Sequence, residues 1–516
     1  MSRRSEPAPA LGRLEMLRWT WRQLTSMRTA LVLLLLLSVA AVPGSLLPQR
    51  VVNVKTVDGF KAANPDLSRW LERLGLFDVY SSPWFSGIYL LLMVSLVGCI
   101  LPRTSRYVKL LRSRPPRVPR RLERMPAHER WETPASLDDA VTASRRALGR
   151  ARVDVVEGDG LREISAERGY LREAGNLVFH LSIIIVLVGV AGGSLLGSRG
   201  AAIVTEGDSF SNTLTQYDEF GAGTLFDPGD LVPFALTLDD FEARFQTDGP
   251  QRGAPTLFRA RGTYLEPGST EPRPFDISVN HPLTIDGTSV YLVGNGYAPV
   301  IRVTSPDGRV VFDEAVPFLP ADATYTSNGV VKVAEARPEQ LGFQGFFLPT
   351  AVSRGDVEAS FSAFPAAANP LLGLLVWKGD LGLDAGAPQS VYVLDKRRMT
   401  QYQDADGKPL RITLSPGTVA DLPDGGTIEF VGLKQFARFQ IGSAPGATVP
   451  LVGISIGLLG LMLSLYVRQR RTWMRIRHHQ GVTTIEVAVL DRTQRADLPP
   501  DITALVNRLR RELPER

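Results

Sequence analysis

The chain has 516 residues, with 58 Lys and Arg against 53 Asp and Glu, a formal net charge of +5, 47 Gly and 37 Pro. Long apolar runs alternate with polar stretches, which excludes a wholly soluble enzyme, a collagenous chain and an acidic disordered chain. The single cysteine, Cys99, excludes an internal disulfide, a Cys-x-x-Cys redox pair, a zinc ribbon and an iron–sulfur cluster built from this chain alone.

The first apolar run, from about residue 29 to residue 47, follows a basic stretch at 1–28. Its apolar core is longer than the roughly 7–15 residues of a secretory signal, and its basic lead is long, so we expect a membrane anchor. Three further apolar runs, each also long enough to cross about 30 Å of hydrocarbon, lie at about 85–101, 175–197 and 448–467. The sequence therefore predicts four transmembrane helices.

Basic residues beside the apolar runs predict the orientation, because Lys and Arg concentrate in cytoplasmic loops. Arginines crowd the N-terminus, the stretch from Arg103 to Arg124 and the stretch from Arg468 to Arg477. Segment 198–447 has the opposite balance, with 19 Lys and Arg against 30 Asp and Glu. Basic patches this close to a membrane favour anionic lipid over nucleic acid as a partner, and no nucleic-acid-binding motif accompanies them.

These patterns predict a multi-pass protein of the cell membrane with both termini in the cytoplasm. The expected segments are a cytoplasmic N-terminus at 1–28, a first span at 29–47, an external loop at 48–84, a second span at 85–101, a cytoplasmic segment at 102–174, a third span at 175–197, an extracytoplasmic domain at 198–447, a fourth span at 448–467 and a cytoplasmic tail at 468–516.

The extracytoplasmic segment has the pattern of a β-rich domain. Stretches 257–264, 275–279 and 427–431 alternate or are enriched in β-branched and aromatic residues, and Ser305-Pro-Asp-Gly308 is a good hairpin turn. We predict a sandwich or barrel-like domain. The fold class is then a polytopic α-helical membrane protein with four transmembrane helices and a large β-rich extracytoplasmic domain between the third and fourth.

The two cytoplasmic segments resemble small α/β pieces. The tail is expected to contain a strand near Thr484–Val489 and a helix from about Pro500 to Leu513. We find no phosphate-binding P-loop, no His-Glu-x-x-His zinc helix and no dinucleotide fingerprint, so no catalytic residue is expected.

His180 is the one histidine inside a predicted span, and an ionisable group in a membrane is a functional candidate. It lies roughly 8 Å along the helix from Gly175, toward the cytoplasmic leaflet. It is either a neutral imidazole bonded to a neighbouring helix, or an axial ligand or proton-handling group. The other histidines, which lie in polar segments, are His128, His281, His478 and His479.

Small residues four apart also mark two of the spans. The third carries Gly189, Gly193 and Gly197, and the fourth carries Gly453 and Gly457. Such spacing lets another helix approach closely. Packing among the four spans is the simpler interpretation, and a face for a partner subunit is the alternative.

Several motifs together resemble the ResB family of CcsB-type cytochrome c biogenesis proteins. They are Val42-Pro-Gly-Ser-Leu-Leu-Pro-Gln49, Leu76-Phe-Asp-Val-Tyr-Ser-Ser-Pro-Trp-Phe85, Gly98-Cys-Ile-Leu-Pro-Arg103, His180, Asn280-His-Pro-Leu-Thr-Ile-Asp-Gly-Thr-Ser-Val-Tyr291 and Arg470-Arg-Thr-Trp473. The resemblance covers nearly the whole chain, and the order of the motifs makes it specific.

The resemblance implies a complex with a ResC/CcsA-type membrane protein that handles haem and attaches it to apocytochrome c outside the membrane. The thiols of apocytochrome c must be reduced, which implies a thioredoxin-like reductant in the same pathway. The partner carries a tryptophan-rich haem-binding loop, whereas the tryptophans of this chain are scattered at 19, 21, 70, 84, 131, 377 and 473. The chain thus resembles the accessory subunit and not the whole synthetase.

For this family, neutral imidazole makes His180 a candidate axial ligand of haem iron, with the second ligand supplied by the partner. His281 is a weaker candidate for contact with haem or apocytochrome c, and a hydrogen-bonding residue in a strand or turn is its alternative role. Cys99 is expected to be a small buried apolar residue.

The competing function is a membrane-anchored scaffold or client-binding protein that contacts no haem. A transporter for another solute is less favoured, since four spans alone make a small pathway.

Overall fold

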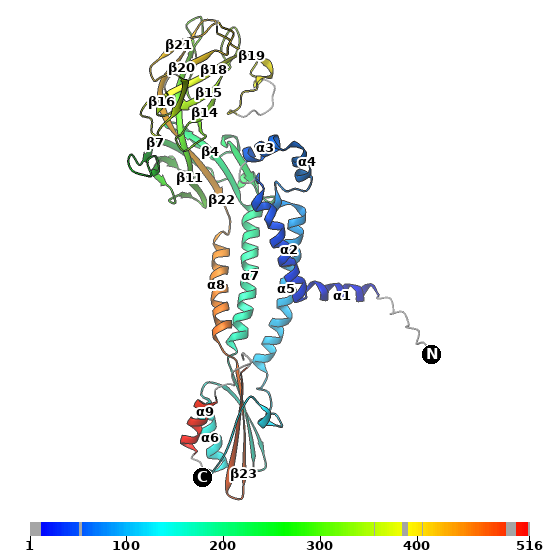
Figure 1. Cartoon of the computed structure of the whole chain (residues 1–516). Coiled ribbons are helices and arrows are strands. Elements are labelled where there is room, and N and C mark those ends of the chain that lie inside the picture. The colour runs from blue at the N-terminus through cyan, green and yellow to red at the C-terminus, as the bar shows by residue number, and fades with distance from the viewer. Residues whose placement is uncertain are drawn as a thin grey trace. The chain divides into compact units, whose positions relative to one another are not determined.

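The computed structural model describes residues 12–50, 54–354, 357–383, 391–404, 406–491 and 502–513. The chain divides into two compact units, one of residues 1–191 with 446–516 and one of residues 192–445 (Figure 1). The first unit holds most of the helices, and the second is built almost entirely of strands.

The prediction of four membrane helices is confirmed. Each of the four is long and apolar enough to cross a bilayer, and they are α2 (Met27–Leu46), α5 (Pro83–Arg112), α7 (Leu171–Leu196) and α8 (Thr448–Tyr466). Helix α7 begins four residues before the predicted start, with Arg172 and Glu173 in its first turn.

Helix α5 extends beyond the second span predicted at 85–101, since it continues to Arg112 with Pro102 inside it. Proline removes only one backbone N–H, here the one that would bond to Gly98 O, so the helix continues with a single backbone hydrogen bond missing. Beyond the proline, Thr104 bonds back to the helix through its side chain, with Oγ1 donating to Ile100 O at 3.1 Å. The extra turns carry the helix beyond its apolar part into the basic stretch.

The N-terminal residues form a helix of their own, α1 (Arg13–Leu24), joined to α2 by an elbow. The elbow lies against α5, where Ser95 Oγ donates to Leu24 O at 2.6 Å and Cys99 Sγ donates to Thr25 O at 2.8 Å. Cys99 is only partly buried. It therefore serves as a weak hydrogen-bond donor that holds the elbow, and the expectation of a merely apolar buried residue is corrected.

The two segments predicted to be cytoplasmic form a single antiparallel sheet with strand order β1-β24-β23-β3-β2. Its strands are β1 (Ala127–Thr133), β2 (Arg152–Gly158), β3 (Leu161–Arg168), β23 (Arg470–His479) and β24 (Val482–Asp491). Helices α6 (Leu137–Leu148) and α9 (Thr503–Glu512) share one hydrophobic core with this sheet (Figure 1). The strand and helix predicted for the tail are present as β24 and α9.

Strand β23 lies in the basic stretch from Arg468 to Arg477, which was predicted to lie at the membrane surface. Its Met474 and Ile476 are fully buried, and Arg475 is 7% exposed. The guanidinium of Arg475 bonds to Glu163 Oε1 at 3.0 Å, so part of the basic stretch lies inside the sheet and not against lipid.

The second unit consists of antiparallel sheets, which confirms the β-rich region. The sheet strands are β4 (Ser198–Thr205), β6 (Glu219–Ala222), β10 (Leu283–Ile285), β11 (Thr288–Thr304), β12 (Val310–Ala315), β21 (Val419–Asp421) and β22 (Thr427–Ser443) in a first sheet; β13 (Leu319–Pro320), β14 (Ser327–Val333), β15 (Leu341–Leu348), β18 (Leu371–Gly379), β19 (Met399–Gln401) and β20 (Arg411–Leu414) in a second; β5 (Ser209–Ser211), β7 (Ala235–Phe245), β8 (Pro255–Leu265) and β9 (Arg273–Ser278) in a third; and β16 (Ala351–Arg354) and β17 (Val357–Ser362) in a fourth.

Two long strands, β11 and β22, each of 17 residues, pair along their length and contribute to two separate cores. Ile441 of β22 packs with residues of the third sheet, such as Leu236. Phe430 of the same strand packs with residues of the second sheet, such as Phe343. The predicted sandwich is therefore a pair of sandwiches that share β11 and β22.

The predicted hairpin turn joins β11 to β12. Gly308 N donates to Ser305 O at 2.9 Å, and Gly308 has φ +81°, a conformation that favours glycine. The strands predicted around 257–264, 275–279 and 427–431 are present as β8, β9 and the start of β22.

Candidate functional site

His180 lies on α7, close to the middle of the helix. Its Nδ1 is 2.7 Å from the backbone oxygen of Asn176, one turn earlier. A carbonyl oxygen only accepts hydrogen bonds, so Nδ1 must carry the proton, and the lone pair of the ring is then on Nε2. A metal-ligating histidine uses this arrangement, in which one nitrogen donates to an acceptor and the other is available to the metal.

The side of α7 that carries His180 is not the side that packs on α8. Gly175 and Gly189 face α8, where an added Cβ would come within 2.5 Å of Gly460 O and 2.7 Å of Pro450 Cδ. At 3.6 residues per turn, His180 is rotated about 140° from Gly175 around the helix. Its ring is partly exposed, so the imidazole remains accessible from outside this pair of helices.

The glycines of α7 and α8 form the contact between these two helices. A Cβ on Gly453 would lie 2.8 Å from Val186 Cγ2, and one on Gly457 would lie 2.5 Å from Ser182 Oγ. The interpretation as internal packing is confirmed for Gly189, Gly453 and Gly457. Ser455 lies between them in a Gly-x-Ser-x-Gly run, but its hydroxyl donates to Leu451 O within the helix, at 2.9 Å, and no strand-to-helix turn presents it as a nucleophile.

His281 belongs to the second unit, whereas His180 belongs to the first. It is exposed in the tight turn between β9 and β10, next to Asn280 with φ +65°. Its backbone forms a bridge with Ser278, and its Nδ1 lies 3.2 Å from Val279 O. This is the geometry of a hydrogen-bonded turn residue.

The remaining histidines lie on the sheet of the first unit. His128 is in β1, and His478 and His479 are at the end of β23, where His478 Nδ1 is 2.8 Å from Thr483 Oγ1. Within the described ranges, no group of three or more His, Cys, Asp or Glu residues could hold a metal ion. If iron is bound in the membrane, His180 can supply one ligand to it.

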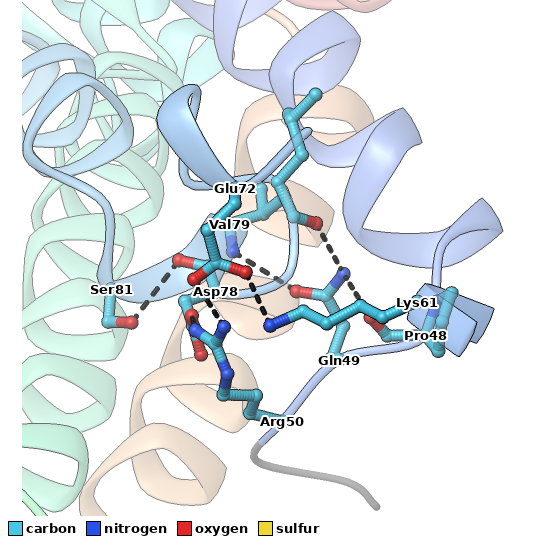
Figure 2. A network of polar contacts seen from close by, with 9 residues as sticks. Pro48, Gln49, Arg50, Lys61, Glu72, Asp78, Val79 and Ser81 are labelled. Atoms are coloured by element: carbon cyan, nitrogen blue, oxygen red, sulfur yellow. Dashed lines mark hydrogen bonds and ion pairs between the residues drawn. The ribbon is translucent and has the colours of Figure 1, made fainter. Parts of the chain in front are cut away.

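Between α2 and α5 lies a compact loop made of α3 (Val54–Ala63), α4 (Pro65–Arg73) and a 3₁₀ turn, η1 (Val79–Ser81). Gln49, a residue that is 7% exposed, connects the parts of this loop by hydrogen bonds (Figure 2). Its Nε2 donates to Leu47 O at 3.1 Å and Leu76 O at 3.0 Å, and its Oε1 accepts from Val79 N at 3.1 Å.

A cluster of charges closes the same loop from outside. Arg50 forms ion pairs with Glu72 and Asp78, and Lys61 Nζ lies 2.6 Å from Glu72 (Figure 2). These cations hold the pKa of Glu72 below its usual range, and the hydrogen bond to Glu72 raises the pKa of Arg50. The motif that ends at Gln49 and the motif that begins at Leu76, both singled out in the sequence, are thus in contact in the fold. The sequence does not show this pairing, because Gln49 and Leu76 are 27 positions apart.

Replacing Gln49 with Leu should open this loop. Each backbone group left without its partner costs about 1–3 kcal/mol, and about 1.4 kcal/mol is a factor of ten. We expect protease cleavage between residues 54 and 82 to accelerate at least about tenfold in the purified full chain. Gln23→Leu, at an exposed position on α1, is the matched control and should leave cleavage unchanged. Equal cleavage of the Gln49→Leu variant and the unaltered chain would contradict the role of Gln49.

Comparison with known proteins places the chain beside one group. A family model described as the ResB-like family matches residues 27–503. The cytochrome c biogenesis protein CcsB of Synechococcus sp. (strain CC9311) is 24% identical over 478 residues, which cover 90% of each chain. The CcsB proteins of Synechococcus sp. (strain WH7803) and Gloeobacter violaceus are 28% identical over 283 residues and 26% identical over 319 residues. These two matches span 58% and 63% of the relatives' own lengths, and 52% and 57% of this chain.

Proposed function

Because the chain belongs to the ResB-like family, we propose that it is a membrane subunit of a cytochrome c biogenesis complex. In this proposal it helps to bind or deliver haem and presents apocytochrome c for covalent haem attachment outside the membrane. The names of the relatives support the assignment to cytochrome c biogenesis, since they are called cytochrome c biogenesis protein CcsB. The haem-binding role rests on the geometry of His180.

The geometry of His180 is the main support for the proposal. Its Nδ1 proton is held by Asn176 O, which orients the ring and leaves Nε2 free to act as an axial ligand. Bound haem would supply the iron for this ligand and the vinyl groups to which the cysteine thiols of apocytochrome c add. The partly exposed ring faces away from α8, so a second helix bundle, that of a ResC/CcsA-type partner, can supply the other axial ligand.

The single cysteine also fits an accessory role. Cys99 is bonded to Thr25 O at the α1–α2 elbow, and one thiol cannot form a dithiol pair. The proposal therefore assigns reduction of apocytochrome c to a separate thioredoxin-like protein. It assigns the exposed turn of His281 to the surface that meets haem or apocytochrome c, with a smaller effect on function than His180.

A second candidate function is a membrane-anchored scaffold or client-binding protein that contacts no haem. The observation in its favour is that the part of the chain described by the structure brings no cluster of metal-binding side chains together around His180. The two functions predict different effects of replacing His180, because a scaffold that binds no haem does not need an imidazole at this position.

The proposal requires the β-rich unit to lie outside the membrane and the five-stranded sheet to lie in the cytoplasm. Reporters are best inserted in turns, at Gly160 between β2 and β3 and at Gly249 between β7 and β8. A fluorescent protein that folds only in the cytoplasm should be bright at Gly160 and dark at Gly249, and alkaline phosphatase should show the opposite. A cytoplasmic signal at Gly249 would reverse the orientation and remove the basis for an outer role.

A further inference from the structure

A pocket of about 670 Å³ opens in the first unit where three apolar helices end. Leu111 is the penultimate residue of α5, Leu171 is the first residue of α7, and Val467 follows the last residue of α8. All three line the pocket. Helices α7 and α8 end next to their apolar parts, whereas α5 has already run past its own, so the pocket borders the level at which α7 and α8 leave the hydrocarbon. The rest of its wall comes from β2, β3 and the residues that lead into β23.

The wall of the pocket is strongly cationic. It contains Arg150, Arg152, Arg168 and Arg468. Arg152 is engaged, because its Nη1 donates to Leu111 O at 2.6 Å. Within the described part of the chain, the other three guanidiniums have no ion-pair partner, and all three side chains are exposed.

The one acidic residue in the wall, Glu167, does not neutralise these arginines. It is 1% exposed and accepts from Gln469 Nε2 at 2.8 Å, Arg471 Nε at 2.9 Å and the hydroxyl of Tyr170 at 3.1 Å. Of these donors, only Tyr170 lines the pocket. The charge of Glu167 is thus compensated mainly by residues outside the pocket wall, and three arginines of the wall have no counter-charge among the described residues.

The backbone on one side of the pocket has little freedom to collapse. Gly169 has φ +92°, and a Cβ at this position would lie 2.2 Å from Arg468 O. The segment that leads into α7 therefore passes directly over the segment that leaves α8. This crossing holds Arg168 and Arg468, on neighbouring segments, at the same opening.

We propose that this pocket binds the phosphate headgroup of an anionic phospholipid in the adjacent leaflet. Guanidinium groups match phosphate oxygens with paired hydrogen bonds, and basic pockets between membrane helices suit anionic headgroups. The position of the pocket, at the ends of α7 and α8, favours a lipid over a soluble anion. The inference stands apart from the haem-binding role and needs no assignment of the two membrane sides.

The test uses the purified full chain in detergent, titrated with dioleoyl phosphatidylglycerol or dioleoyl phosphatidylcholine and followed by native mass spectrometry. The unaltered chain should retain the anionic lipid at least about tenfold more tightly than the zwitterionic one. The triple variant Arg150→Gln, Arg168→Gln, Arg468→Gln should lose this preference. A control with the same change in charge, Arg121→Gln, Arg124→Gln, Arg145→Gln, should keep it, because these arginines do not line the pocket.

Equal binding of the two lipids by the unaltered chain would overturn the proposal, and this comparison needs no variant to fold. Equal loss in the control variant would also overturn it, since it would show attraction to overall charge and not to the pocket. Inorganic phosphate or hemin that displaces phosphatidylglycerol at equal concentration would assign the pocket to a soluble anion or to haem carboxylates instead.

Discussion

Replacing His180 with Ala should reduce the output of mature cytochrome c at least about tenfold, in cells that carry the chain together with its partner. Loss of a partner that merely orients a metal ligand already costs about 10–100-fold in affinity or activity, so loss of the ligand itself should cost no less. Alanine favours helix, and α7 should still form and insert. Added imidazole, which can enter the vacated position, should restore part of the output.

Histidine replacements elsewhere on the chain provide matched controls. His281→Ala should have a smaller effect, because this residue lies in an exposed turn, and His128→Ala should have none. All variants must be compared at equal abundance in the membrane, since a misfolded complex also loses activity. Normal cytochrome c output from a stable His180→Ala chain would leave the scaffold as the better function.

The chain expressed without its partner should give little mature cytochrome c in a host that lacks this pathway, and coexpression with a ResC/CcsA-type protein should restore it. The physical reason is that His180 offers one axial ligand and the single cysteine, Cys99, offers no redox pair. Haem-stained gels of membrane fractions, with cytochrome c antigen as loading control, measure the result. Full maturation by the chain alone would show that it is a complete synthetase and not an accessory subunit.

Local patterns in the sequence were sufficient to predict the elements that depend on neighbouring residues. The four apolar runs gave the four helices, and the Ser305–Gly308 turn gave the hairpin between β11 and β12. His180 could be selected because an ionisable residue in an apolar run is conspicuous. The hydrogen bond from its Nδ1 to Asn176 O spans four residues, as side-chain bonds within a helix do. It could be assigned only once the structure showed that both residues lie in α7.

Features that join distant parts of the chain could not be predicted in this way. Trp473 pairs in register with Ser165 across about 300 residues, so segments 102–174 and 468–516 looked like separate pieces although they form one sheet. The basic stretch around Arg475 was predicted to lie at the membrane surface, because the sequence pattern does not reveal that Glu163 lies beside Arg475. The extension of α5 to Arg112 was not predicted, because the apolar run ends at Leu101 and the basic residues that follow carry no apolar signal for a helix.

The same limit applies to the polar sites. Gln49 and Leu76 stood out as parts of two motifs, yet only the fold brings them into hydrogen-bond contact. The arginines at 150, 168 and 468 appeared in the sequence only as general basic charge, and the crossing of the segments before α7 and after α8 gathers them around one pocket.

The central claim, that His180 supplies an axial ligand to haem iron, is tested most directly by the absorption spectrum of the complex. The chain is copurified with its membrane partner, and reduced-minus-oxidised spectra are recorded for the unaltered complex and for His180→Ala at equal protein content. We predict a haem signal in the first, its loss in the second, and its partial return when imidazole is added. An unchanged haem spectrum in the His180→Ala complex would contradict the claim and leave the imidazole as a residue bonded only to Asn176.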